Sequence, residues 1–246
     1  SAVQLRPRTK RGFTKGRGIQ RPMARYGDRA YWDERYAFDP DPFDWYQRYG
    51  TCTAFRDAIR NNVQRSDQIL IVGAGTSRLS EEMYNDGYSN LFNVDTSTVA
   101  CKLLDERYER AGGLPIDNRH GDVRSLDFND GSFDAVIDKG TLDALLCSDS
   151  TAGHAMLTEV SRVLRQSGGL FVHVTDCPED QRLPILQLPG FNWKLHKNVK
   201  LPRPVQIHLT SFPKQGREAQ GESPLESHRV YVMKRTANII PGMGSK

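Results

Sequence analysis

A short glycine-containing segment, Gly73-Ala74-Gly75-Thr76-Ser77, offers backbone chemistry for ligand binding. Four apolar residues, Ile69–Val72, precede it and are typical of a buried strand in a parallel sheet. Gly73 and Gly75 allow a tight turn and a close approach of the backbone to a ligand. A turn of this kind at the carboxyl edge of a parallel sheet is where nucleotide-like ligands bind. The residues that follow must identify the ligand.

Acids after the later strands narrow the class of ligand. Arg78 stands where the GxGxxG fingerprint of dinucleotide-binding proteins has its third glycine, and no P-loop lysine follows. Asp95 ends the predicted second strand and suits the two hydroxyls of a ribose. Asp122 follows the third and can bind an adenine amino group, while Val123 contacts the ring. Each position alone is more often an ordinary loop residue, but the ordered set describes an adenosine site without a phosphate cradle and indicates S-adenosylmethionine.

Two further acids and a lysine follow the predicted fourth strand, 133–138. Asp138, Lys139 and Asp143 lie at the edge of the sheet that would face the methyl-donor end of such a cofactor. They could position a cationic sulfonium or an incoming amine, and Asp138 and Asp143 are the candidates for a catalytic base. The structural alternative is a loop before a helix, with Asp143 as an acid of the first helical turn.

The hydrophobic pattern predicts the elements that position these residues. Apolar spacing predicts helices at 52–63, 79–87, 99–112 and 156–164, and strands at 69–72, 91–95, 133–138, 170–174, 205–212 and 228–234. A third strand with a weak signal is expected near 117–120. Repeated βα units imply a parallel sheet with right-handed crossovers. The last two strands have only a loop, 213–227, between them and imply an antiparallel hairpin. We therefore expect one α/β domain at 26–236, a Rossmann-like, doubly wound sheet of seven strands.

Composition limits the class of protein. The 246 residues are 37% hydrophobic and 26% charged, which fits a soluble globular domain. No apolar run approaches the roughly 18 residues that span a bilayer. The four cysteines are widely spaced without nearby histidines, so we expect no metal site, no disulfide framework and a reducing compartment.

The charge is concentrated at one end of the chain. Eight of the 34 lysines and arginines lie in residues 1–25, which hold no acid, and the remainder has 26 basic against 30 acidic residues, a net charge of −4. We expect 1–25 to be a disordered basic tail that is solvated or attaches to RNA or an acidic partner. A transit peptide is a third interpretation. Residues 237–246 should be a flexible end. The expected location is the cytoplasm, with the nucleus and mitochondria kept open by the tail.

The sequence also resembles a known family, the class I, seven-β-strand S-adenosylmethionine-dependent methyltransferases. Within them it is similar to the methyltransferase-like group that modifies lysines of translation elongation factor 1-alpha. The similarity covers about 26–235, and its most specific parts are Tyr31-Trp32-Asp33-Glu34-Arg35-Tyr36, Phe43-Asp44-Trp45 and Ile137-Asp138-Lys139-Gly140-Thr141-Leu142-Asp143-Ala144-Leu145. The resemblance implies methyl transfer from S-adenosylmethionine, with S-adenosylhomocysteine as product, to a protein lysine.

The resemblance also assigns roles to residues. In the family the aromatic segment contacts the cofactor, whereas the residues alone favour a flap that is merely packed on the domain. It further implies a ribose-binding pair, an adenine-binding pair and a lysine in the wall of the site. Together with the glycine turn, the predicted cofactor-binding set is Trp32, Tyr36, Trp45, Gly73, Gly75, Asp95, Thr96, Asp122, Val123 and Lys139.

The chain departs from the family at two places. The turn reads Gly73-Ala74-Gly75-Thr76-Ser77 instead of the usual Gly-Cys-Gly-Asn-Ser, which a cofactor held by backbone contacts should tolerate. The segments that would shape the acceptor pocket also differ, because the region after Leu146 is shorter than in the family and residues 199–226 match poorly. Two alternatives therefore remain open: a methyltransferase of small-molecule nitrogen or oxygen atoms, and a non-catalytic binding protein that the basic tail tethers to RNA.

Overall fold

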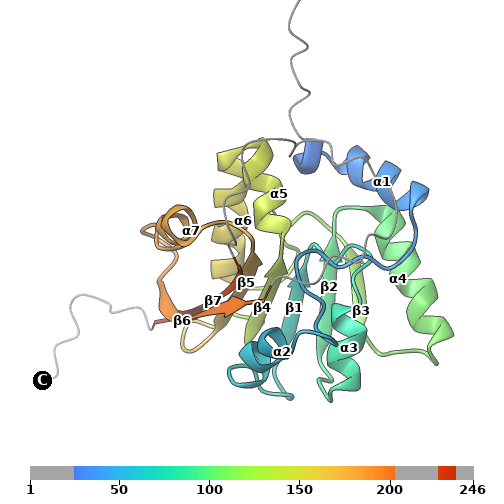
Figure 1. Cartoon of the computed structure of the whole chain (residues 1–246), viewed down its shortest axis with the longest axis horizontal. Coiled ribbons are helices and arrows are strands. Elements are labelled where there is room, and N and C mark those ends of the chain that lie inside the picture. The colour runs from blue at the N-terminus through green and yellow to red at the C-terminus, as the bar shows by residue number, and fades with distance from the viewer. Residues whose placement is uncertain (1–24, 203–226, 237–246) are drawn as a thin grey trace, which may run out of the picture.

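One sheet forms the centre of the computed structural model, which describes residues 25–202 and 227–236 (Figure 1). Its strands are β1 (Ile69–Val72), β2 (Leu91–Asp95), β3 (Asp117–His120), β4 (Ala135–Lys139), β5 (Leu170–Thr175), β6 (Trp193–Leu201) and β7 (His228–Arg235). They lie in the order β3-β2-β1-β4-β5-β7-β6. The first five are parallel, and β7 runs antiparallel to β5 and β6 on either side of it. The structure thus confirms the predicted seven-stranded, mostly parallel α/β fold.

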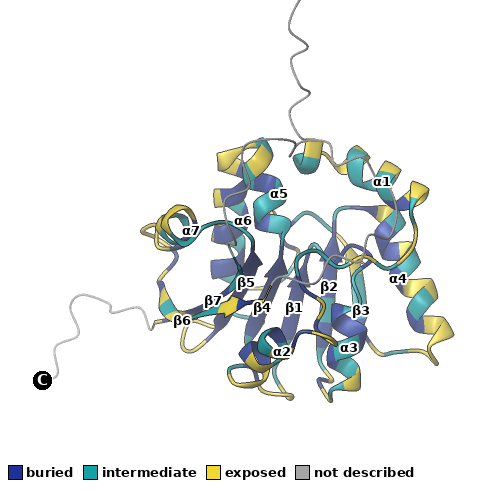
Figure 2. Cartoon of the chain, in the orientation of Figure 1, coloured by how far each residue is buried: buried dark blue, intermediate teal, exposed yellow. Residues whose placement is uncertain are grey.

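Helices surround this sheet. They are η1 (Arg25–Gly27), α1 (Arg29–Phe38), α2 (Thr53–Arg60), α3 (Leu79–Asn85), α4 (Thr98–Arg110), α5 (Thr141–Ser148), α6 (Ser150–Val163) and α7 (Glu179–Leu186). Figure 2 shows buried strands between helices whose outer sides are exposed. The short η1 packs beside α5 and α1 beside α4, so the start of the described chain lies along one edge of the sheet (Figure 1).

The alternation of side chains along β1 explains the two hydrophobic cores. Ile69 and Ile71 belong to the cluster with α2, α3 and α4, whereas Leu70 and Val72 belong to the cluster with α5, α6 and α7. All four are buried, as expected for a strand covered on both faces. Because β1 pairs with β2 and β4, the turn that follows it lies between the ends of both neighbours.

The antiparallel end of the sheet differs from the prediction. The strand that pairs with β7 is β6, Trp193–Leu201, and not 205–212. Trp193 and Leu201, at the two ends of β6, are buried, and Leu195 and Val199 between them are partly buried. These four residues alternate with polar ones, a strand pattern that the prediction did not use. The predicted strand 205–212 lies outside the described residues, as do most of the loop 213–227 and the ends of the chain at 1–24 and 237–246.

The helices η1, α1 and α7 were not predicted, and α5 was anticipated only as the structural alternative for the residues after β4. Asp28 caps α1 by accepting the N–H of Ala30 at 2.9 Å, which is the usual role of an aspartate at a helix start. Within the described ranges, no helix is long and apolar enough to cross a bilayer. The same ranges contain no group of three or more His, Cys, Asp or Glu side chains placed to hold a metal ion.

Candidate functional site

A cavity opens at the carboxyl ends of β1, β2 and β4, beneath η1, α1 and the segment 43–50. It contains about 790 Å³ of space between its walls, a figure that includes open solvent at its mouth. The structure brings all ten predicted cofactor-binding residues into its wall: Trp32, Tyr36, Trp45, Gly73, Gly75, Asp95, Thr96, Asp122, Val123 and Lys139. These ten residues, which come from separate parts of the sequence, therefore converge on one space.

The glycine turn forms the floor of the cavity. Gly73 and Gly75 have φ angles of 63° and 53°, in the left-handed region that favours glycine. A Cβ atom on Gly73 would lie 1.9 Å from Oγ1 of Thr141, and one on Gly75 would lie 2.5 Å from the hydroxyl of Tyr36. Both glycines are therefore required by backbone angle and by space, and they leave the main chain bare toward the cavity.

Asp95 lies at the end of β2 and is buried. Its Oδ2 accepts the N–H of Gly75 at 2.7 Å and its Oδ1 accepts the N–H of Ser97 at 2.8 Å. Burial raises the pKa of this carboxyl, although the two backbone donors oppose that shift. Each oxygen keeps a lone pair for a further donor, which is what the paired hydroxyls of a ribose would require.

Asp122 and Val123 form another part of the wall, after β3. The Asp122 carboxylate pairs with Arg124 at 2.6 Å, and this partner holds its pKa below the usual range. Its side chain is 41% exposed, whereas Val123 is buried in the core beside α5 and α6. The pair therefore offers a charged acceptor at the mouth and an apolar surface behind it.

Aromatic rings close the cavity from above. Trp32 and Tyr36 are four residues apart on α1, so their rings share one face and stack with centroids 5.8 Å apart. Trp45 meets Trp32 edge-on at 6.3 Å, and Tyr26 stands 5.9 Å from Trp32. The indole N–H of Trp32 donates to the carbonyl of Tyr26 at 2.7 Å. The rings form a wall that could cover a flat ligand and exclude water.

A buried ion pair fastens the segment 43–50 across the cavity. Nζ of Lys139 lies 3.0 Å from Oδ1 of Asp44 and donates to the carbonyl of Trp45 at 3.2 Å. Asp44 also accepts the hydroxyl of Ser77 and, at 3.4 Å, the N–H of Arg78. Burial opposes the ionisation of Asp44, but these partners outweigh it and hold its pKa below the usual range.

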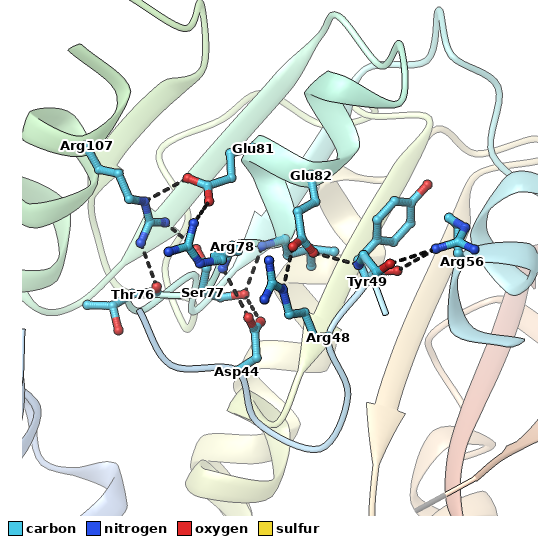
Figure 3. A network of polar contacts seen from close by, with 12 residues as sticks. Asp44, Arg48, Tyr49, Arg56, Thr76, Ser77, Arg78, Glu81, Glu82 and Arg107 are labelled. Carbon is cyan, nitrogen blue, oxygen red and sulfur yellow. Dashed lines mark hydrogen bonds and ion pairs between the residues drawn. The ribbon is translucent and has the colours of Figure 1, made fainter. Parts of the chain in front are cut away.

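A wider polar network supports the turn from outside (Figure 3). Arg107 on α4 donates to the carbonyl of Thr76 at 2.9 Å and to that of Ser77, and its Nε lies 2.9 Å from Glu81. Arg48 pairs with Glu82 on α3 at 2.6 Å. The carbonyls of the turn are thus engaged on the side away from the cavity.

The geometry of this site can be compared with known proteins. Residues 70–172 match the family described as a methyltransferase domain. A relative from Mus musculus named EEF1A lysine methyltransferase 4 is 35% identical over 182 residues, which make up 69% of this chain and 69% of the relative. This chain belongs to that family of S-adenosylmethionine-dependent methyltransferases.

A second relative and a solved structure are also similar to this chain. Another Mus musculus relative, named eEF1A lysine and N-terminal methyltransferase, is 32% identical across 61% of this methyltransferase and 22% of its own length. The solved structure titled as the [4+2]-cyclase SpnF has a TM-score of 0.61 at 13% identity, covering 90% of this chain and 100% of that one. At such low identity the likeness concerns the fold alone, because one fold carries different chemistries.

The two candidate catalytic acids of the methyltransferase do not line the cavity. Asp138 is fully buried, accepts the N–H of Thr141 at 2.8 Å and has its Oδ2 2.6 Å from Nδ1 of His173. Its carboxylate thus holds the first turn of α5 and links β4 to β5. The contacts give Asp138 an evident structural role beneath the site, and its assignment as a base stays a prediction.

Asp143 lies in the first turn of α5. It accepts the hydroxyl of Tyr46 at 3.0 Å, the hydroxyl of Thr175 at 2.8 Å and a guanidinium N–H of Arg182. Burial raises its pKa despite the cations nearby. Asp143 thereby connects the segment 43–50 to the end of β5 and to α7.

Sequence reasoning missed several residues of the wall. Tyr26 and Gly27 reach it because η1 folds back onto α5, where the N–H of Gly27 donates to the hydroxyl of Ser148 at 2.8 Å. No local pattern signals a contact across 121 positions. Thr141, in contrast, lies within the motif 137–145, and a polar residue so close to Lys139 could have been included.

Proposed function

We propose that this methyltransferase transfers a methyl group to the side-chain amine of a protein lysine, with elongation factor 1-alpha as the acceptor. The relatives' names support this acceptor, since both act on eEF1A according to those names. One observation supports the proposal most strongly: a single cavity contains both the adenosine-type floor of Gly73, Gly75 and Asp95 and a wall of aromatic rings. The resemblance associates that aromatic wall with the elongation-factor group. A small-molecule acceptor is the competing outcome.

The residues of the cavity fit S-adenosylmethionine as methyl donor. Gly73 and Gly75 line the cavity without a side chain of their own, which allows a ligand to approach the backbone closely. Asp95 retains acceptor capacity for the ribose hydroxyls. We assign the adenine to Asp122 and Val123 and the donor end to the Lys139 side of the cavity. Bound there, the sulfonium would supply an electrophilic methyl carbon.

The chain then has three tasks in the reaction. It must hold the acceptor amine about 3 Å from the methyl carbon and in line with the bond to sulfur. It must favour the neutral amine over the ammonium, which the desolvating rings of Trp32 and Trp45 promote. It must also limit the access of water, for which the Lys139–Asp44 pair holds the segment 43–50 in place.

Radiolabel transfer tests the proposal. The protein is incubated with tritiated S-adenosylmethionine and purified elongation factor 1-alpha, and mass spectrometry locates the modified lysine. We expect labelled protein from the wild type and at least a tenfold weaker calorimetric affinity for the product S-adenosylhomocysteine in Asp95→Ala, about 1.4 kcal/mol. In a cell lysate, label transferred to low-mass compounds other than S-adenosylmethionine, with none in protein, would favour a small-molecule acceptor. Unchanged affinity in Asp95→Ala would refute the assignment of Asp95.

The location and the basic segment remain proposals from sequence. We propose a cytoplasmic location, where elongation factors work, and fractionation of cells that express the tagged protein would test it. For residues 1–25 we predict electrostatic attachment to RNA, because eight positive charges stand there without an acid. Deletion of this segment should weaken RNA binding and flatten its dependence on salt. An unchanged salt slope would contradict the attachment.

A further inference from the structure

Two exposed phenylalanines lie five positions apart in the sequence, beside the cavity. Among the described residues, the large hydrophobic side chains that face solvent are Phe38 at 77% exposure, Phe43 at 42% and Leu188 at 42%. Phe38 ends α1, and Phe43 lines the cavity while remaining exposed. A single exposed apolar side chain is ordinary, but a group of them next to a ligand site is typical of a surface that a partner covers.

The segment 38–43 is held in a defined shape. Two of its six residues are prolines, which fix their own φ angles and restrict the residues before them. Oγ1 of Thr76, in the glycine turn, donates to the carbonyl of Asp41 at 3.2 Å and accepts the N–H of Phe43 at 3.3 Å. Because these contacts order the segment before a partner arrives, binding to it would lose little conformational entropy.

The charge between the two rings is negative. Asp39 and Asp41 stand between them in the sequence, without a base, and Asp41 is exposed while Asp39 is half-buried. The base nearest in the sequence is Arg35, whose guanidinium lies over the ring of Phe43, 4.9 Å from its centroid. The surface therefore complements a partner that carries positive charge beside an apolar side chain.

Phe43 connects this surface to the donor end of the cavity. Its ring meets that of Trp45 edge-on at 5.2 Å, and the carbonyl of Trp45 accepts a hydrogen bond from Lys139 at 3.2 Å. A polypeptide that lay across the segment 38–43 would thus pass the mouth of the cavity. A long side chain such as lysine could enter there while its neighbours stayed on the surface.

We propose that the segment 38–43 is the docking surface for the lysine-bearing segment of the acceptor protein. Phe38 and Phe43 contact an apolar side chain near the target lysine, and Asp39 and Asp41 attract the positive charges around it. The inference rests on the proposed function, because it requires a protein acceptor, and it adds the part of this chain that selects the acceptor. Neither acid lines the cavity, so their attraction serves docking and leaves the amine to be desolvated inside.

Phe38→Ser is the most direct variant. Phe38 does not line the cavity and is largely exposed, so its loss should disturb neither cofactor binding nor the fold. Leu188→Ser is its matched control, because Leu188 is also exposed but follows α7, which lies at the other end of the sheet from α1 (Figure 1). For the charges, Asp39→Asn combined with Asp41→Asn is compared with Asp57→Asn, which is exposed on α2.

The experiment measures kcat and KM with purified elongation factor 1-alpha, the calorimetric Kd of S-adenosylhomocysteine and the thermal midpoint. For Phe38→Ser we expect KM to rise about fivefold or more, with kcat, the Kd and the midpoint close to wild type. Leu188→Ser should keep KM within about twofold. The double aspartate variant should raise KM at low salt and weaken the dependence of KM on added salt, whereas Asp57→Asn should change neither.

Each contrary result has a distinct meaning. A KM that Phe38→Ser changes no more than Leu188→Ser does overturns the docking surface. A KM that falls in Phe38→Ser overturns it too, because the surface would then hold a competing part of this chain. A wild-type dimer that Phe38→Ser dissociates in sedimentation would assign the surface to a second copy and likewise overturn the inference. A wild type that labels no protein refutes the proposed function itself, and the docking surface with it.

Discussion

Gly75→Ala should destabilise the fold through one identifiable contact. The left-handed φ of 53° costs an alanine about 1–2 kcal/mol. The new Cβ would lie 2.5 Å from the hydroxyl of Tyr36, whose ring is buried and stacked on Trp32 and so cannot move away freely. Overpacking of this kind costs about 1–3 kcal/mol. The free energy of unfolding in urea should therefore fall by about 2–5 kcal/mol.

Two further variants separate these terms. In Gly75→Ala combined with Tyr36→Phe, the nearest atom to the new Cβ is a ring carbon at 3.3 Å, so about 1–3 kcal/mol should return as coupling energy. Gly113→Ala has a similar φ of 74° with no atom within 4 Å of the Cβ, and it should cost only about 1–2 kcal/mol. A coupling energy within about 0.5 kcal/mol of zero would refute the contact between Gly75 and Tyr36.

Two other variants test the fastening of the site. Lys139→Met leaves the Asp44 carboxylate buried without its ammonium and should cost about 3–5 kcal/mol at neutral pH. The pKa of Asp44 is lowered in the folded state, so its ionised form stabilises the wild type above about pH 4, and this stabilisation is lost as the pH falls below that value. In Lys139→Met the same fall in pH should no longer reduce the free energy of unfolding. Acid unfolding followed by circular dichroism measures the difference. Arg107→Ala removes the donors to two carbonyls of the glycine turn and should raise the Kd of S-adenosylhomocysteine about tenfold. Arg110 is exposed on the same helix, and Arg110→Ala should change this Kd less than about twofold. Equal effects of the two arginines would contradict the support assigned to Arg107.

The elements that could be predicted have strong local signals. The run Ile69–Val72 matches β1 residue for residue, because a strand buried on both faces needs only apolar side chains. Asp117–His120 was predicted at the correct bounds from the alternation of elements around it. In α1, the four-residue spacing of Trp32 and Tyr36 already places both rings on one helical face, a signal that the sequence interpretation did not use.

The features that could not be predicted depend on distant partners. β6 carries apolar residues at alternate positions, but a bulge between Leu195 and Lys197 places Val199 and Leu201 in the other core from Trp193 and Leu195. Only the pairing with β7 reveals this change of face. The ion pair of Lys139 with Asp44 joins positions 95 residues apart, and no spacing rule relates them. Whether Asp138 faces a ligand or caps a helix is likewise decided by the first turn of α5 and by His173, which lies 35 residues further along the chain.

The contacts explain why the resemblance to the elongation-factor group was more specific in some motifs than in others. The floor of the cavity presents backbone at the glycine turn, so Ala74 can replace the family's cysteine with little consequence. The segment 43–50, in contrast, is held by pairs of side chains from separate motifs. Asp44 pairs with Lys139, and Tyr46 donates to Asp143. A pair restricts both of its members, whereas a backbone contact restricts neither. The motifs that hold the segment 43–50 therefore identify the family, whereas the glycine turn indicates only the general type of cofactor.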